Sequence, residues 1–144
     1  MVAVNANRTR MLYVEDDRAS MLLMRHLFRK KFPGVIMLEA ETAERGVELA
    51  LTCRPSLILM DILLPGLDGY EGLERLRNLK ETTAIPVWAI SALAMEEDVR
   101  RALDAGFVRY IRKPLNVEDF TGEIEHFLAE QSKTRQVPGG YDLV

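Results

Sequence analysis

The sequence lacks the features of several large classes of protein. Cys53 is the only cysteine among the 144 residues, so a disulfide within the chain is impossible. No apolar run reaches the ~18 residues that a membrane span needs, and the N-terminal stretch MVAVNANRTR contains no apolar signal core. We therefore expect a cytoplasmic protein that does not interact with a membrane.

A large excess of charge of one sign is also absent. The chain has 19 lysine and arginine residues against 22 aspartate and glutamate residues, a net charge of −3, and no basic block stands out. A nucleic-acid surface needs clustered positive charge, so nucleic acid is not an expected partner. The phosphate-binding loop G-x-x-x-x-G-K-[ST] is also missing, which argues against chemistry driven by a bound nucleotide.

What is present is a regular alternation of two kinds of segment. Short apolar runs with strand character lie at residues 11–14, 35–38, 57–60, 87–90 and 107–111. Each run is followed by apolar residues at helical spacing, and five such repeats predict an α/β protein with a five-stranded parallel sheet and helices on both faces. The expected domain spans residues 9–131, between an N-terminal extension (1–8) and a flexible C-terminal tail (132–144).

Polar side chains that could form a site follow four of the five predicted strands. These are Glu15, Asp16 and Asp17 after the first strand, Asp61 after the third, Ser91 after the fourth and Lys113 after the fifth. Because the carboxyl ends of parallel strands meet at one edge of a sheet, we expect these side chains to converge. Several carboxylates so close would repel one another, and Mg²⁺, which prefers oxygen ligands, is the natural compensation.

Ser91 and Lys113 are not needed by a metal and point to an anion instead. A lysine is a point charge suited to an anion, and a hydroxyl can donate to one of its oxygens. If Asp61 attacks a phosphoryl group, the product is an acyl phosphate whose oxygens Mg²⁺, Ser91 and Lys113 could share. Without a nucleotide loop, the phosphoryl group would have to arrive on a carrier.

Four motifs together carry a resemblance to a known family. They are VEDD after the first strand, LILMDILLPGLDGYE around the third, ISA at the fourth and YIRKP at the fifth. Over about residues 9–131 the chain resembles the receiver domain of a two-component response regulator, of the stand-alone type. The resemblance implies a flavodoxin-like (βα)5 receiver fold and a signalling switch. Such a switch is not an enzyme, apart from catalysing its own phosphorylation and dephosphorylation.

The resemblance also implies roles for the acidic residues. Asp61 would be the phospho-acceptor, and Mg²⁺ would be held by Glu15, Asp16, Asp61 and the main-chain carbonyl of Leu63. Glu15 stands where many family members have aspartate, so its longer side chain is expected to reach the metal through water. Asp17 is expected to cap the first helix instead of binding the metal.

The remaining roles concern the phosphoryl group and the response to it. Lys113 would contact the phosphoryl group, Ser91 would be the switch hydroxyl, and Tyr110 would be an aromatic switch whose rotamer follows Ser91. Simple packing on an edge strand is the alternative for Tyr110. The implied partners are a histidine kinase or histidine phosphotransfer protein and a downstream protein target, with the chain itself a monomer or weak dimer.

Two other interpretations of the whole chain stay open. It could be a receiver-like interaction module that is never phosphorylated, which failure to react with acetyl phosphate would favour. It could also be a receiver domain excised from a hybrid kinase or a longer regulator. A metal-dependent phosphohydrolase fits less well, because such enzymes generally want a second acid two residues beyond the nucleophile, where this chain has Leu63.

Overall fold

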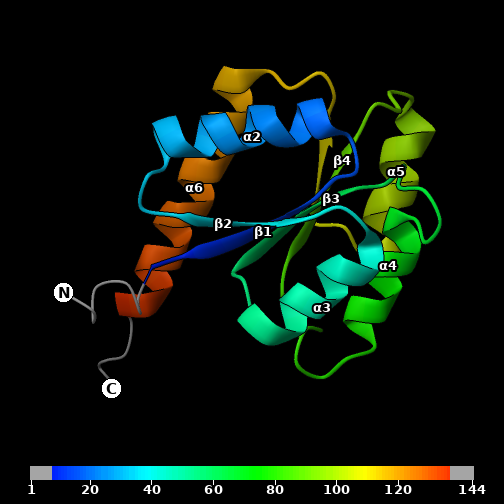
Figure 1. The fold of residues 1–144 in the computed structure, drawn as a ribbon, viewed down its shortest axis with the longest axis horizontal. Coiled ribbons are helices and arrows are strands. Elements are labelled where there is room, and N and C mark those ends of the chain that lie inside the picture. Colours follow the sequence, from blue (N-terminus) through cyan, green and yellow to red (C-terminus); the bar gives the residue numbers. More distant parts are fainter. Residues whose placement is uncertain (1–7, 137–144) are drawn as a thin grey trace. The chain divides into compact units, whose positions relative to one another are not determined.

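A computed structural model describes residues 8–136, which belong to two compact units (Figure 1). The first unit ends at Lys113 and contains β1 (Arg10–Val14), α2 (Arg18–Lys31), β2 (Ile36–Ala40), α3 (Ala43–Cys53), β3 (Leu57–Asp61), α4 (Gly69–Arg77), β4 (Val87–Ser91), α5 (Glu96–Ala105) and β5 (Arg109–Arg112). The second unit begins at Pro114 and contains α6 (Val117–Gln136). No helix within residues 8–136 is both long and apolar enough to span a membrane.

All five strands form one sheet in the order β2-β1-β3-β4-β5, and every neighbouring pair is parallel. The two strands β3 and β4 are buried along their whole length. This agrees with their sequences, LILMD and VWAIS, because a parallel strand covered on both faces needs an apolar side chain at nearly every position. The predicted five-stranded parallel sheet is therefore confirmed.

Helices cover both faces of this sheet within the first unit. Successive side chains of β1 point to opposite faces. Leu12 and Val14 belong to the apolar core that also contains Ala43 of α3 and Leu73 of α4, so these helices share one face with them. Figure 1 shows α2 on the face opposite α3, α4 and α5. The arrangement leaves the carboxyl ends of all five strands at one edge, as the alternation predicted.

Two local features determine how the chain continues after β1 and β3. The side chain of Asp17 accepts a hydrogen bond from the Ser20 main-chain N–H (2.9 Å), so Asp17 caps α2 as predicted. At the start of α4, a Cβ added to Gly69 would lie 2.6 Å from the carbonyl oxygen of Asp61. Only glycine lets α4 begin this close to the end of β3.

The strand bounds differ from the predicted ones by at most two residues, and the differences at the fifth strand and at the last helix have a local physical cause. The fifth strand begins at Arg109 instead of residue 107, because Gly106 ends α5 with a φ of 121° and the Phe107 N–H donates back to Ala102. The last helix continues to Gln136, so it includes the first five residues of the segment predicted as a C-terminal tail, 132–136. Residues 132–136 contain no glycine or proline to stop the helix, even though the apolar spacing has ended. The rest of that predicted tail, and residues 1–7, lie outside the described residues.

Candidate functional site

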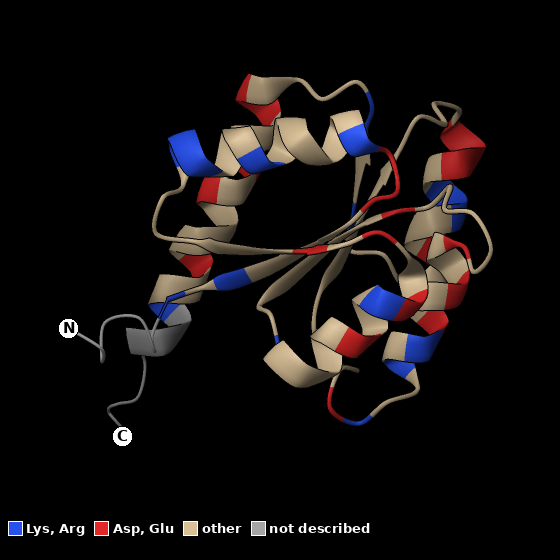
Figure 2. Ribbon diagram, viewed as in Figure 1, with Lys and Arg blue, Asp and Glu red and all other residues tan. Residues whose placement is uncertain are grey.

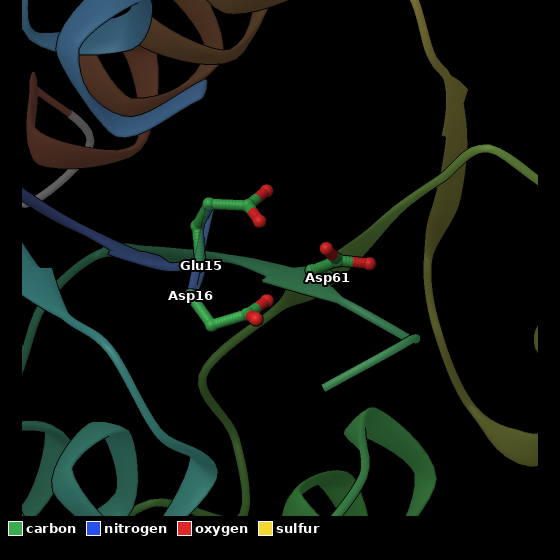
Figure 3. Close-up of side chains that lie close together, drawn as sticks. All are labelled: Glu15, Asp16 and Asp61. Carbon is green, nitrogen blue, oxygen red and sulfur yellow. The ribbon is translucent and has the colours of Figure 1, made fainter. Parts of the chain in front are cut away.

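Three carboxylates meet at the strand ends. Glu15 and Asp16 follow β1, Asp61 ends β3, and each offers an oxygen that lies within 4.8 Å of the others (Figure 3). The consecutive acidic residues between β1 and α2 are visible as a red loop in Figure 2. Glu15 and Asp61 are buried, whereas Asp16 is exposed. The predicted convergence of these side chains is therefore present in the structure.

Asp61 is 5 % exposed and is held through both of its carboxylate oxygens. Oδ1 accepts the Leu63 main-chain N–H at 2.9 Å, and Oδ2 accepts from Nζ of Lys113 at 3.1 Å. Burial raises the pKa of Asp61 above its ordinary value, and the charge of Glu15 adds to this, although the bonds from Leu63 and Lys113 act in the opposite direction. Because burial and Glu15 destabilise the charged form of Asp61, a cation beside this carboxylate is stabilising.

Lys113 connects two of the acids. Its ammonium lies 2.6 Å from Oε1 of Glu15 and 3.1 Å from Oδ2 of Asp61. Burial alone would lower the pKa of Lys113, but the hydrogen bonds and charges of Glu15 and Asp61 outweigh burial and raise it. Lys113 is therefore a fixed positive charge beside Asp61, and its main-chain N–H also donates to the carbonyl of Ser91 (2.9 Å).

Glu15 is more fully engaged than the sequence indicated. Its side chain is 1 % exposed, and three donors reach it: Lys113 and the Tyr13 hydroxyl at Oε1, and the Asp17 N–H at Oε2. Sequence analysis missed Tyr13. The available signal was its spacing, because residues two apart on a strand share a face and a buried phenol needs a partner.

Ser91 and Tyr110 contact the same residue of the loop between β4 and α5. The main-chain N–H of Leu93 donates to Oγ of Ser91 at 3.1 Å, and the Tyr110 hydroxyl donates to the Leu93 carbonyl at 2.7 Å. Ser91 is fully buried, whereas Tyr110 is partly exposed at the edge of the sheet. The backbone of Leu93 therefore links the two predicted switch residues.

The donor set fits a divalent cation. The cluster holds three carboxylates and one ammonium, that of Lys113, which pairs with Glu15 and Asp61. This leaves an excess of negative charge on oxygen ligands, the type that Mg²⁺ prefers. Asp16 is the most accessible of the three, and each oxygen of Asp61 accepts one hydrogen bond, whereas Oε1 of Glu15 already accepts two. A cation here would therefore be held mainly by Asp16 and Asp61. Binding of the metal by the main-chain carbonyl of Leu63 stays a prediction.

Comparison with known proteins gives consistent results. Residues 11–125 match the family described as response regulator receiver domain. The chain is 36 % identical over 126 residues to the KDP operon transcriptional regulatory protein KdpE of Escherichia coli, but it spans only 54 % of that protein's length. It is 35 % identical over 119 residues to the polar-differentiation response regulator DivK of Brucella anthropi, covering 83 % of this chain and 95 % of DivK.

One solved structure adds a metal to this comparison. It is the receiver domain of the sensor histidine kinase PA1611 from Pseudomonas aeruginosa, described with a magnesium ion coordinated in its active site cleft. The similarity has a TM-score of 0.75 at 25 % sequence identity and covers 85 % of this chain and 98 % of that chain. The likeness therefore extends over nearly the whole of a receiver domain.

Proposed function

Because this chain belongs to the response regulator receiver domains of two-component systems, which are phosphorylation-activated switches, we propose that Asp61 is its phospho-acceptor. The observation that carries the proposal is the distance of 3.1 Å between Nζ of Lys113 and Oδ2 of Asp61. Asp61 ends the buried strand β3, and its carboxylate lies next to that of Asp16. A nucleophile, a cation and further ligand oxygens are thus within reach of one incoming group. The phosphoryl donor is a histidine kinase or a histidine phosphotransfer protein.

The reaction is a transfer between two side chains. An oxygen of Asp61 attacks the phosphorus of a phosphohistidine, the P–N bond breaks, and the imidazole leaves with the electron pair and takes a proton. Asp16, Asp61 and the Leu63 carbonyl would hold Mg²⁺, which would supply positive charge to stabilise the phosphoryl oxygens. Lys113 neutralises one phosphoryl oxygen, and the Ser91 hydroxyl donates to another. Hydrolysis of the acyl phosphate by water resets the switch.

Ser91 and Tyr110, which both bond to the backbone of Leu93, transmit the effect of phosphorylation to the surface. When the Ser91 hydroxyl turns to the phosphoryl group, it releases the Leu93 N–H, and the loop that also receives the Tyr110 hydroxyl must rearrange. The surface around α5 and β5 changes as a consequence, and a downstream protein recognises the changed surface. The chain acts in the cytoplasm as a monomer or weak dimer in this proposal.

The test is to incubate the purified protein with acetyl phosphate and Mg²⁺ and to locate the phosphoryl group by mass spectrometry after borohydride reduction. We expect one modified residue, Asp61, and no modification in Asp61→Asn. Asp16→Ala should weaken magnesium binding, measured through the fluorescence of Trp88. Unmodified wild-type protein would favour an interaction module that works without phosphorylation, and full-strength magnesium binding in Asp16→Ala would reject the metal assignment.

A further inference from the structure

A buried tyrosine contacts the candidate site from β1. Tyr13 is 1 % exposed and precedes Glu15 by two residues, so both side chains leave the sheet on the same face. Its hydroxyl donates to Oε1 of Glu15 at 2.9 Å. A phenol carries its proton at neutral pH and a carboxylate oxygen can only accept, so the Tyr13 hydroxyl is the donor of this bond.

The oxygen that receives the tyrosine also receives the lysine. Oε1 of Glu15 accepts from Tyr13 at 2.9 Å and from Nζ of Lys113 at 2.6 Å. An oxygen of a carboxylate has two lone pairs, so these two donors complete Oε1. Oε2 is held by the main-chain N–H of Asp17 at 3.0 Å. Both oxygens of the Glu15 carboxylate are thereby held in place. Because Tyr13 occupies one lone pair of Oε1, Lys113 can bond only to the other.

The orientation of Glu15 decides where the ammonium stands. Lys113 lies closer to Glu15 (2.6 Å) than to Asp61 (3.1 Å), so Glu15 is its nearer anchor. Without the phenol, one lone pair of Oε1 becomes available. The carboxylate can then turn about its bond from Asp17 or accept another donor, and Lys113 follows it. An ammonium displaced from Asp61 would neutralise an arriving phosphoryl group less well.

We propose that Tyr13 is a positioning residue of the phosphoryl-transfer site, which acts through Glu15 to hold the ammonium of Lys113 beside Asp61. The inference rests on the proposed function of Asp61 and adds a residue that does not touch the phosphoryl group. Tyr13→Phe is a suitable variant because it keeps the ring in the core and removes only the hydroxyl. A purely structural tyrosine would change the stability of the fold and leave the site as it is.

The first measurement is the rate of phosphorylation by acetyl phosphate as a function of magnesium concentration. We expect the rate constant at saturating Mg²⁺ to fall about three- to tenfold in Tyr13→Phe, the range that one hydrogen bond accounts for. The magnesium concentration at half-saturation should not rise, because the change leaves Asp16 and Asp61 intact. Tyr70→Phe, which removes a phenol from α4, is the matched control and should keep the wild-type rate.

The second measurement needs neither metal nor phosphoryl donor. In the metal-free wild-type protein, the two Hε protons of Lys113 should have different NMR shifts, because the ammonium is fixed between two carboxylates. In Tyr13→Phe the difference should shrink, while Tyr70→Phe should retain it. Urea unfolding of both variants separates any general loss of stability from this local effect.

The third measurement asks whether Tyr13 acts through Glu15. In a double-mutant cycle, Tyr13→Phe should slow phosphorylation in the wild-type background but cause no further loss when Glu15→Gln is already present. An equal loss in both backgrounds would overturn the route through Glu15. A rate in Tyr13→Phe equal to that of the wild type, or a loss seen only as weaker magnesium binding, would overturn the inference itself. Absence of label on wild-type Asp61 would instead reject the proposed function.

Discussion

The two sides of the sheet edge that carries the site are built differently. Beyond the ends of β1 and β3, Glu15 and Asp61 both contact the ammonium of Lys113, which follows β5, and the three form a largely buried charged cluster. Next to it, Ser91 at the end of β4 and Tyr110 within β5 make neutral hydrogen bonds to the backbone of Leu93, a residue that is 37 % exposed. Removing Lys113 from the first group leaves two buried carboxylates without their cation, whereas removing a member of the second costs one neutral bond.

In the proposed function, this difference separates the residues that take part in phosphoryl transfer from those that respond to it. The charged cluster holds its members firmly, which suits groups that must stand in place when a phosphoryl group arrives. The neutral bonds around Leu93 are weak enough to exchange partners at small cost, which suits a switch. Four changes test the contrast, ordered from the largest expected effect to the smallest.

Replacing Lys113 by methionine should have the largest effect. The change keeps an unbranched side chain and removes the ammonium, so it leaves the buried carboxylates of Glu15 and Asp61 without a cation. We expect the free energy of unfolding at pH 7 to fall by about 2–3 kcal/mol, measured by urea unfolding without added metal.

A surface lysine provides the control for this variant. Lys133 lies 3.7 Å from Glu130 with its side chain 76 % exposed, so Lys133→Met should change the unfolding free energy by less than about 0.5 kcal/mol. Added magnesium should narrow the difference in unfolding free energy between Lys113→Met and the wild type. It should leave the difference between Lys133→Met and the wild type unchanged. Equal losses in the two variants would contradict the picture of a buried charge cluster.

The lifetime of the phosphorylated form should depend on Leu63 and Leu93. Their N–H groups donate to Asp61 and Ser91, so both side chains begin next to the site, and both are exposed. Neither can orient a water molecule, and both can shield the phosphoryl group. We therefore expect a combined Leu63→Asn and Leu93→Ser variant to release phosphate roughly fivefold faster after the donor is removed, the effect of one hydrogen bond. Release no faster than in the wild type would show that the apolar pair does not set the lifetime.

Replacing Asp61 by asparagine should stabilise the fold slightly. Burial raises the pKa of Asp61, so the folded state binds the proton more tightly than the unfolded state does. The contribution of this group to stability therefore falls as the pH rises from the ordinary aspartate value, near 4, through the raised one. At pH 7 without metal, the unfolding midpoint of Asp61→Asn should lie roughly 2–4 °C above that of the wild type. A gap that stays constant down to pH 4 would point to another cause.

Tyr110→Phe should have the smallest effect on the resting protein. It removes one hydrogen bond near solvent, to the Leu93 carbonyl, so the unfolding free energy should change by less than about 1 kcal/mol and the phosphorylation rate by less than about twofold. Its effect should instead appear when beryllofluoride mimics the acyl phosphate. Amide shifts along α5 and β5 should then be smaller than in the wild type, and unchanged shifts would remove Tyr110 from the coupling.

Much of the fold and the identity of the acids could be predicted from the sequence. Buried parallel strands require apolar runs, and a polar residue directly after such a run falls at one edge of the sheet, so Asp16, Asp61, Ser91 and Lys113 were predictable as a group. The end of α6 was not, because residues 132–136 continue the helix on backbone preference alone, without an apolar pattern to mark them.

Periodicity and strand ends by themselves determined which elements form and which side chains gather at the edge, because both depend on the local pattern of apolar residues. Only the tertiary structure decided how the gathered groups pair. Glu15 contacts a lysine that lies 98 positions further along the chain, and a tyrosine of the core completes the same carboxylate oxygen. Such pairings depend on strand register and side-chain direction to within a few tenths of an ångström, which no local pattern encodes.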